Sequence, residues 1–184
     1  MPTLLLDDGT IKSDFHEILR EIAPLGICLK HYDPGTSLLF PQLLEQDILN
    51  DAEKQQIIEL HNSVFEFIQQ ENGYMWADLL NIHPGSPNFQ NIIATYNRYH
   101  HHTAPEALYI LAGEMIFGFV KPDGQQIQLL IQSQNYIHIP AGVEHWCSPT
   151  ALLHLKAVRY FTTAEGWVPH YTETQLSDSL NQPQ

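Results

Sequence analysis

Basic residues are scarce in this 184-residue chain, which has 8 Lys and Arg against 21 Asp and Glu and a formal net charge of −13. The few cations form no cluster along the sequence. Neither nucleic acid nor an anionic membrane surface is therefore favoured as a partner. A small anionic ligand would need a cation placed directly beside it.

Cysteine and long apolar runs are also scarce. Two cysteines, Cys28 and Cys147, are too few for a disulfide framework. The longest mostly apolar run, residues 107–120, is shorter than the roughly 20 residues that span a bilayer, and it contains Glu114. The first residues, MPTLLLDDGT, lack the basic start and long apolar core of a signal peptide. We therefore expect a cytoplasmic protein without a membrane partner.

The front of the chain carries helical signals. Residues 13–22 predict a short helix, and residues 51–71 predict a longer one that begins with a capping box of Asn50 and Glu53. Residues 25–32 alternate weakly and predict an edge strand.

From about residue 91 the apolar residues recur with a period of two, in short runs separated by turn sequences. The runs are ALYIL, MIFGFV, IQLLIQ, YIHIP and LLHLKAVRYF. Their close spacing predicts a β-sandwich or a small barrel. We expect one domain over residues 1–184, with a helical part over about 1–90, a β-barrel over about 91–172 and a polar, frayed tail over 173–184.

The stretch RYHHHTAPEALYILAG opens this β-rich part and carries metal-ligating side chains at regular spacing. In a strand, residues two apart share a face, so His100 and His102 point one way and His101 the other. Glu106 has the same parity, and His145 in PAGVEHW adds a third imidazole. Three imidazoles and one carboxylate suit a divalent transition metal. Four ligands leave two octahedral positions open for substrate or water, which favours catalysis.

Two strings in this region resemble the two motifs of the cupin superfamily. They supply His100, His102, Glu106 and Gly113, and then Pro140, Gly142 and His145. The resemblance implies a mainly β cupin fold, a double-stranded β-helix or jelly-roll barrel, with a helical N-terminal half. Gln134 stands where the second motif usually has glycine, and we expect Asn135 to supply the tight turn there.

Over residues 15–172 the chain resembles acireductone dioxygenases. The strings ENGYMWADLLNI, PAGVEHW and KAVRYFTTAEGWVPHYT carry this resemblance and are more specific than the cupin motifs. It implies a monomeric enzyme of methionine salvage that cleaves acireductone, a small enediol, with O₂. The cofactor would be one Fe²⁺ or Ni²⁺ per monomer, held by the three histidines and the glutamate, and the ligand types favour neither ion.

Two positions depart from that family's pattern. Leu108 stands where the family has a substrate-binding arginine, and Cys147 where it has an aromatic residue. Arg159 matches an arginine on the family's closing strand, so we expect it to be the catalytic cation. Arg98 lies two residues before His100 and joins Leu108 and Cys147 as a predicted substrate-binding position. Two alternatives stay open: another cupin dioxygenase or isomerase with an altered pocket, and a non-enzymatic metal-binding cupin.

Overall fold

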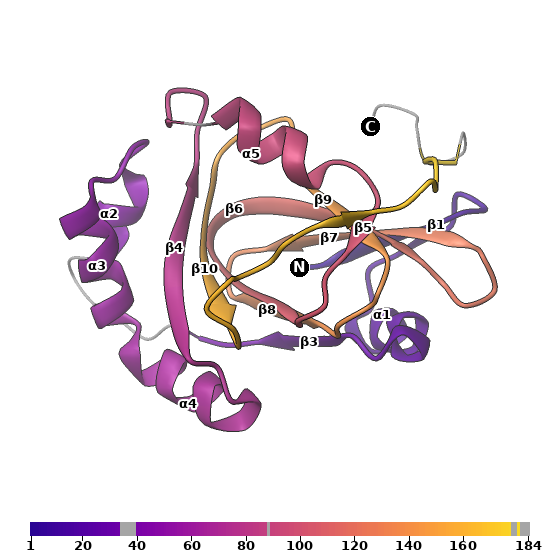
Figure 1. Ribbon diagram of the computed structural model, residues 1–184, viewed down its shortest axis with the longest axis horizontal. Coiled ribbons are helices and arrows are strands. Elements are labelled where there is room, and N and C mark those ends of the chain that lie inside the picture. Colours follow the sequence, from indigo (N-terminus) through magenta and orange to yellow (C-terminus); the bar gives the residue numbers. More distant parts are fainter. Residues whose placement is uncertain (34–39, 88, 178–179, 181–184) are drawn as a thin grey trace.

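The computed structural model describes residues 1–33, 40–87, 89–177 and 180. Its centre is a barrel of antiparallel strands with helices outside it (Figure 1). The described strands are β1 Thr3–Leu6, β2 Ile11–Lys12, β3 Cys28–His31, β4 Trp76–Ile82, β5 His100–His101, β6 Glu106–Val120, β7 Gln126–Gln132, β8 Asn135–Ile139, β9 His145–Pro149, β10 Leu155–Phe161 and β11 His170–Tyr171. The described helices are α1 Phe15–Ile22, the short 3₁₀ helix Ala23–Leu25, α2 Phe40–Glu45, α3 Asp51–Leu60, α4 Asn62–Asn72 and α5 Phe89–Tyr96. No helix within the described ranges is both long and apolar enough to cross a membrane.

Strand β6 joins the two sheets of the barrel. Its first half pairs with β8 and β10, and its second half with β7 and β9. Gly113 lies at the change of partners with a φ of 82°, and a Cβ atom there would lie 1.9 Å from the carbonyl oxygen of His154. Only glycine fits such a bend. The runs ALYIL and MIFGFV are therefore two halves of one bent strand.

The front of the chain is less helical than the sequence predicts. Strand β3 confirms the predicted edge strand and pairs with β8, while β1 pairs with β7 and β4 with β10. The barrel sheets thus begin well before residue 91. Sequence reasoning missed β4 because both of its faces are covered: Leu79 packs in one apolar core and Leu80 against another. A strand that is apolar on both faces lacks the period-two signal.

The helix expected over residues 51–71 is present but broken. The capping box at its start is confirmed, yet α3 ends before His61, and α4 begins after it. His61 is 2% exposed and leaves the helical conformation, with φ −94° and ψ 2°. Ile57 and Ile68 are buried on the two sides of this break, while Phe67 faces solvent.

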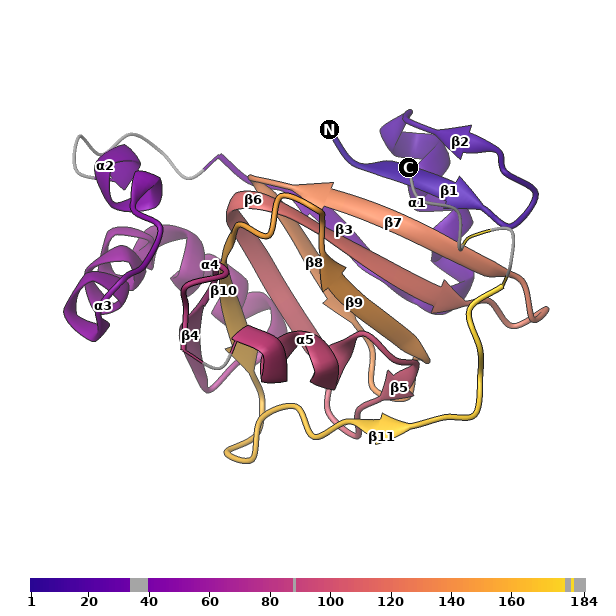
Figure 2. The same cartoon turned by 90° about the horizontal axis from the view of Figure 1, so that it is seen from above.

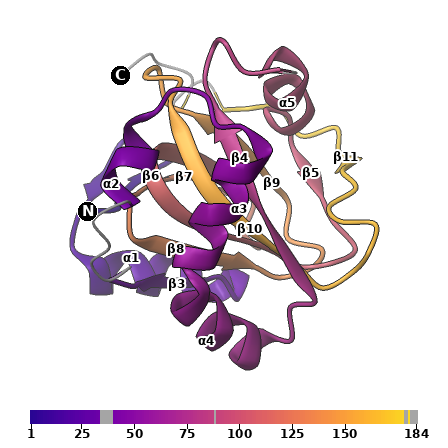
Figure 3. The same cartoon turned by 90° about the vertical axis from the view of Figure 1, so that its left-hand side faces the viewer.

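Two apolar cores lie on opposite faces of β6 and β10. The inner core fills the barrel and includes Leu108 and Ile110, together with Ile18 and Ile22 of α1. The outer core includes Tyr109 and lies between the sheet and α2, α3 and α4, which cover one side of the molecule (Figure 3). Because side chains alternate along a strand, β6 serves both cores. Figure 2 shows α5, β5 and β11 on one side of the barrel and α1 on the other.

The turn before β8 corrects one expectation. Gln134, and not Asn135, takes the left-handed conformation, with a φ of 70°. Its backbone N–H donates to the Ile110 carbonyl at 2.8 Å and its carbonyl accepts from the Tyr32 N–H at 2.9 Å, so neighbouring segments hold it in place. Asn135 already belongs to β8, and its Oδ1 accepts from the Gln132 N–H at 3.0 Å.

A second expectation that the structure corrects concerns the C-terminal tail. The tail was expected to be frayed, but its described part packs on the barrel. Ser177 Oγ donates to Asp7 Oδ1 at 2.9 Å, and Leu180 is 5% exposed. The remaining tail positions, 178–179 and 181–184, lie outside the described residues.

Candidate metal centre

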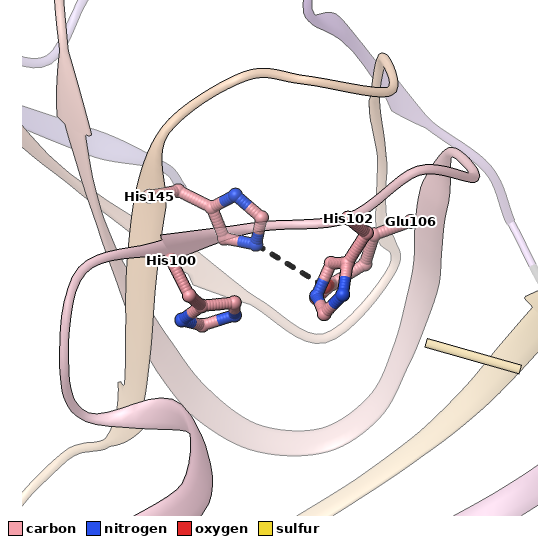
Figure 4. Close-up of side chains that lie close together, drawn as sticks. All are labelled: His100, His102, Glu106 and His145. Atoms are coloured by element: carbon pink, nitrogen blue, oxygen red, sulfur yellow. Dashed lines mark hydrogen bonds and ion pairs between the residues drawn. The ribbon is translucent and has the colours of Figure 1, made fainter. Parts of the chain in front are cut away.

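The four residues expected to bind metal meet inside the barrel, with their side chains directed at one another (Figure 4). His100 comes from β5, His145 from β9 directly opposite, Glu106 from the start of β6, and His102 from the connection between β5 and β6. All four are buried, and their ligand atoms lie within 4.8 Å of one another. His101 is half-buried, and its ring stacks on that of His170 at 5.4 Å, as the strand parity indicates.

Backbone carbonyls orient all three imidazoles. The Nδ1 atoms lie 2.6 Å from Arg98 O for His100, 2.9 Å from Val168 O for His102 and 2.8 Å from Val143 O for His145. A carbonyl oxygen only accepts, so each Nδ1 carries the proton and each Nε2 offers a lone pair to a ligand. The Nε2 atoms of His100 and His102 are buried and make no hydrogen bond of acceptable geometry with any described residue. These donors fit a divalent transition metal.

The charge states also suit a metal. Burial lowers the pKa of His100 to about 4, so its imidazole is neutral. Glu106 is 2% exposed, and its Oε2 lies 3.0 Å from His102 Nε2 and 3.2 Å from His145 Nε2. Burial alone raises the pKa of Glu106, but these two histidines, when protonated, outweigh burial through hydrogen bonds and charge and bring it below its usual range. Glu106 is therefore a carboxylate and His100 a neutral imidazole, which are ligand-competent forms.

A small inner cavity adjoins Glu106. Its volume is about 20 Å³, and it is lined by Leu108, Cys147 and Arg159 among other residues. Three of the four residues predicted around the substrate therefore meet beside Glu106. Burial, and next the Glu106 charge, raise the pKa of the Cys147 thiol, so it stays protonated. Arg98 lies elsewhere: it is exposed, and its guanidinium carbon lies 4.5 Å from the centroid of the Tyr171 ring.

Arg159 is held by an ion pair. On β10 it lies opposite Asp78 of β4 and Leu108 of β6. Its Nε donates to Asp78 Oδ1 at 2.7 Å and its Nη2 to Oδ2 at 2.5 Å, and its guanidinium lies 5.7 Å from the Trp167 ring centroid. Burial lowers the pKa of Arg159, but the hydrogen bonds and charge of Asp78 outweigh burial and raise it. Arg159, the predicted catalytic cation, thus lines the cavity, and Asp78 neutralises part of its charge.

Three further residues surround this cavity that the sequence did not predict as site residues; of these, Trp167 is expected from the sequence to serve packing. Tyr96 and Trp167 line it, and Asp78 fixes Arg159. Burial raises the pKa of Tyr96 to about 12, so its hydroxyl stays protonated. Because an arginine in an apolar strand needs a partner, the position of Arg159 predicts a nearby carboxylate. Because β4 was not recognised as a strand, nothing pointed to Asp78.

An antiparallel barrel in which three histidines and a glutamate converge defines a cupin with a potential metal-binding site. Comparison with known proteins shows to which cupin family the chain belongs. Residues 36–169 match the model of the ARD/ARD' family. The chain belongs to the ARD/ARD' family, which confirms the resemblance inferred from its motifs.

Individual relatives agree with this assignment. The chain is 75% identical over 181 residues to an acireductone dioxygenase of Nostoc sp., covering 98% of this chain and 100% of the relative. It is 45% identical over 176 residues to one of Trichodesmium erythraeum, covering 96% and 97%. The solved acireductone dioxygenase of Bacillus anthracis, with a cadmium ion in its active centre, superposes with a TM-score of 0.85 at 24% identity, covering 93% of this chain and 98% of that one. This structural likeness confirms the cupin fold.

Proposed function

We propose that this protein cleaves acireductone with O₂, as a metal-dependent dioxygenase of methionine salvage. Its cofactor is one Fe²⁺ or Ni²⁺ per monomer, bound by His100, His102, Glu106 and His145. The observation that carries the proposal is the buried convergence of these donors. Its occurrence in a chain 75% identical to the Nostoc acireductone dioxygenase supports the choice of reaction.

The residues around the donors have distinct roles in this proposal. A divalent metal held by His100, His102, Glu106 and His145 would supply Lewis acidity toward an enediolate. The backbone bonds at Nδ1 keep the imidazoles aimed at this metal site. Arg159 attracts the anionic substrate against the net charge of −13. Asp78 keeps the guanidinium at the cavity wall and offsets part of its charge.

Leu108 and Cys147 shape the substrate's surroundings. Leu108 is 1% exposed and offers no hydrogen bond where the family usually has an arginine. Together with Met115 it gives the cavity an apolar wall, which suits an uncharged methylthio chain. The same two departures support the alternative of a cupin dioxygenase or isomerase acting on a different enediol.

The test is anaerobic addition of acireductone to protein loaded with iron or with nickel, followed by oxygen and product analysis. We expect formate and the 2-oxo acid precursor of methionine with iron, and carbon monoxide with nickel. Metal-free protein is the control. No consumption above that control with either metal would contradict the proposal. Consumption of a different enediol by the same samples would favour the alternative.

A further inference from the structure

A second, larger cavity lies against the wall of the inner one. This outer chamber has a volume of about 310 Å³. The inner cavity, at about 20 Å³, has room for about one water molecule. Leu80 and Arg159 line both. These two side chains are therefore the wall between the chamber and the cavity beside Glu106.

The same elements line both spaces. On β4, Asp78 and Leu80 are two residues apart and share a face. On α5, Ile92 lines the outer chamber and Tyr96 the inner cavity. They are four residues apart and so lie on one face of the helix. The chamber and the cavity thus follow each other along one path between β4, β10 and α5.

The outer chamber has the chemistry of a binding site. The side chains of Asn81 and Ser86 line it. The Asn81 Oδ1 and Ser86 Oγ atoms are buried beneath its surface without a hydrogen-bond partner in the described parts of the chain. Lys54 and Arg159 bring positive charge, of which Asp78 in the same lining offsets one unit, and Leu49 and Ile92 add apolar surface. A volume near 300 Å³ is at the lower end for small-molecule pockets. These groups suit a small molecule with an oxygen-rich head and a short apolar tail.

We propose that the outer chamber is a docking site for such a molecule, and that Arg159 opens the wall when its ion pair with Asp78 breaks. No ligand larger than water fits the inner cavity as it stands, so some wall must move. The Arg159 side chain is 23% exposed and that of Asp78 36%, so water can solvate both groups as they part. The identity of the ligand rests on the proposed function, but the path does not.

A rival entrance lies on another side of the site. A surface cavity of about 320 Å³ is lined by Trp146, next to Cys147 on β9, and by Thr174. It shares no lining residue with the inner cavity. A substitution that fills this surface cavity can therefore serve as the control for substitutions that fill the outer chamber.

Reaction of Cys147 with methyl methanethiosulfonate tests the path without any turnover. The thiolate attacks the reagent's sulfenyl sulfur, which forms a methyl disulfide and releases methanesulfinate. Cys147 is 3% exposed and lines the inner cavity, so its rate reports opening. Nickel-loaded protein is used, and mass spectrometry separates Cys147 from half-buried Cys28, whose rate is the internal reference.

The variants act on the wall and on the chamber. Asp78→Asn should raise the Cys147 rate roughly tenfold, the scale of one charge-assisted hydrogen bond. Ile92→Trp and Ser86→Trp, which fill the chamber, should each lower it by a similar factor. Glu21→Gln, which removes the ion pairs of Glu21 with Lys12 and Lys121 elsewhere in the fold, should leave the Cys147 rate unchanged.

Thr174→Trp, which fills the rival cavity, should likewise leave the rate at the parent value. The proposal is overturned if both filling variants label at the parent rate, or if Thr174→Trp slows labelling and they do not. Thermal unfolding of each variant confirms that it is folded. Because the rate does not depend on the substrate, these outcomes are separate from failure of the proposed dioxygenase activity.

Discussion

Buried polar groups on the two faces of β6 differ in whether they have hydrogen-bond partners within the protein. On the outer face, hydroxyl groups find partners within the protein. The Tyr74 and Tyr136 hydroxyl oxygens lie 2.7 Å apart, and the Tyr74 hydroxyl lies 2.6 Å from His138 Nδ1. Tyr109, which projects from β6 itself, donates to a backbone carbonyl at 2.9 Å. These hydrogen bonds join β6, β8, the segment after β3 and the segment after α4.

On the inner face, nitrogen lone pairs converge instead. The Nε2 atoms of His100 and His102 point at Glu106 and lack hydrogen-bond partners among the described residues. Burying unsatisfied polar atoms costs free energy, so a cluster of them is expected where a ligand compensates. Adjacent residues of β6 therefore lie on different faces. Glu106 lies on the binding face and Ala107 on the structural face.

The sharpest way to break this comparison is to remove one inner ligand. His100→Ala should weaken metal binding by more than about 100-fold, because even partners outside the coordination shell cost 10- to 100-fold. His101→Ala, the adjacent residue on the opposite face, should keep the parent metal content. Metal analysis after dialysis measures both. Loss of metal in His101→Ala with retention in His100→Ala would reverse the assignment.

A second change tests the cation at the inner cavity. Arg159→Met should keep the metal and lower kcat/KM by about 10- to 150-fold, the worth of a charge-assisted contact. Arg98→Met is the matched control, because Arg98 is exposed and lies outside the cavity. Steady-state kinetics on metal-quantified samples provides the measurement. An unchanged kcat/KM in Arg159→Met would show that the substrate anion is held by other groups.

The outer face should show its structural role through pH. Burial lowers the pKa of His61 to about 4, against about 6.5 in an unfolded chain. Between these values only the unfolded state binds the proton, so stability is lost as the pH falls through that window. At about pH 5 the loss should be about 2 kcal/mol relative to neutral pH.

His61→Leu should remove this part of the pH dependence. The variant is compared with the parent by urea unfolding at about pH 5 and about pH 7. His16→Leu, at an exposed position of α1, serves as the control. A parent and a His61→Leu variant with the same loss of stability between the two pH values would contradict the expectation.

The smallest expected effect is at the outer tyrosine pair. Tyr136→Phe removes one buried hydroxyl and leaves Tyr74 with its histidine contact. We expect a loss of about 1 kcal/mol in unfolding free energy, with metal content unchanged. Tyr171→Phe, at a residue 45% exposed, should cost less. Loss of metal in Tyr136→Phe would show that the two faces are coupled.

Local signals explain why the ligand set was predicted. His100 and His102 were predicted from strand parity, although His102 lies just beyond β5, and His145 stands in a short string with its own turn residues. The capping box at Asn50 depends on neighbours three residues apart and is confirmed. The break at His61 could not be predicted, because no proline or glycine marks it in the sequence.

The sequence by itself determined the cupin fold, the family, and the residue types and spacing of the four candidate ligands. The tertiary structure alone decided that Asp78 pairs with Arg159, that Gln134 bears the positive φ, and that Leu80 and Arg159 separate two cavities. Strand parity and helix capping depend on residues only a few positions apart, so they can be recognised in the sequence. Asp78 and Arg159 are 81 residues apart and meet only because β4 and β10 pair in one register.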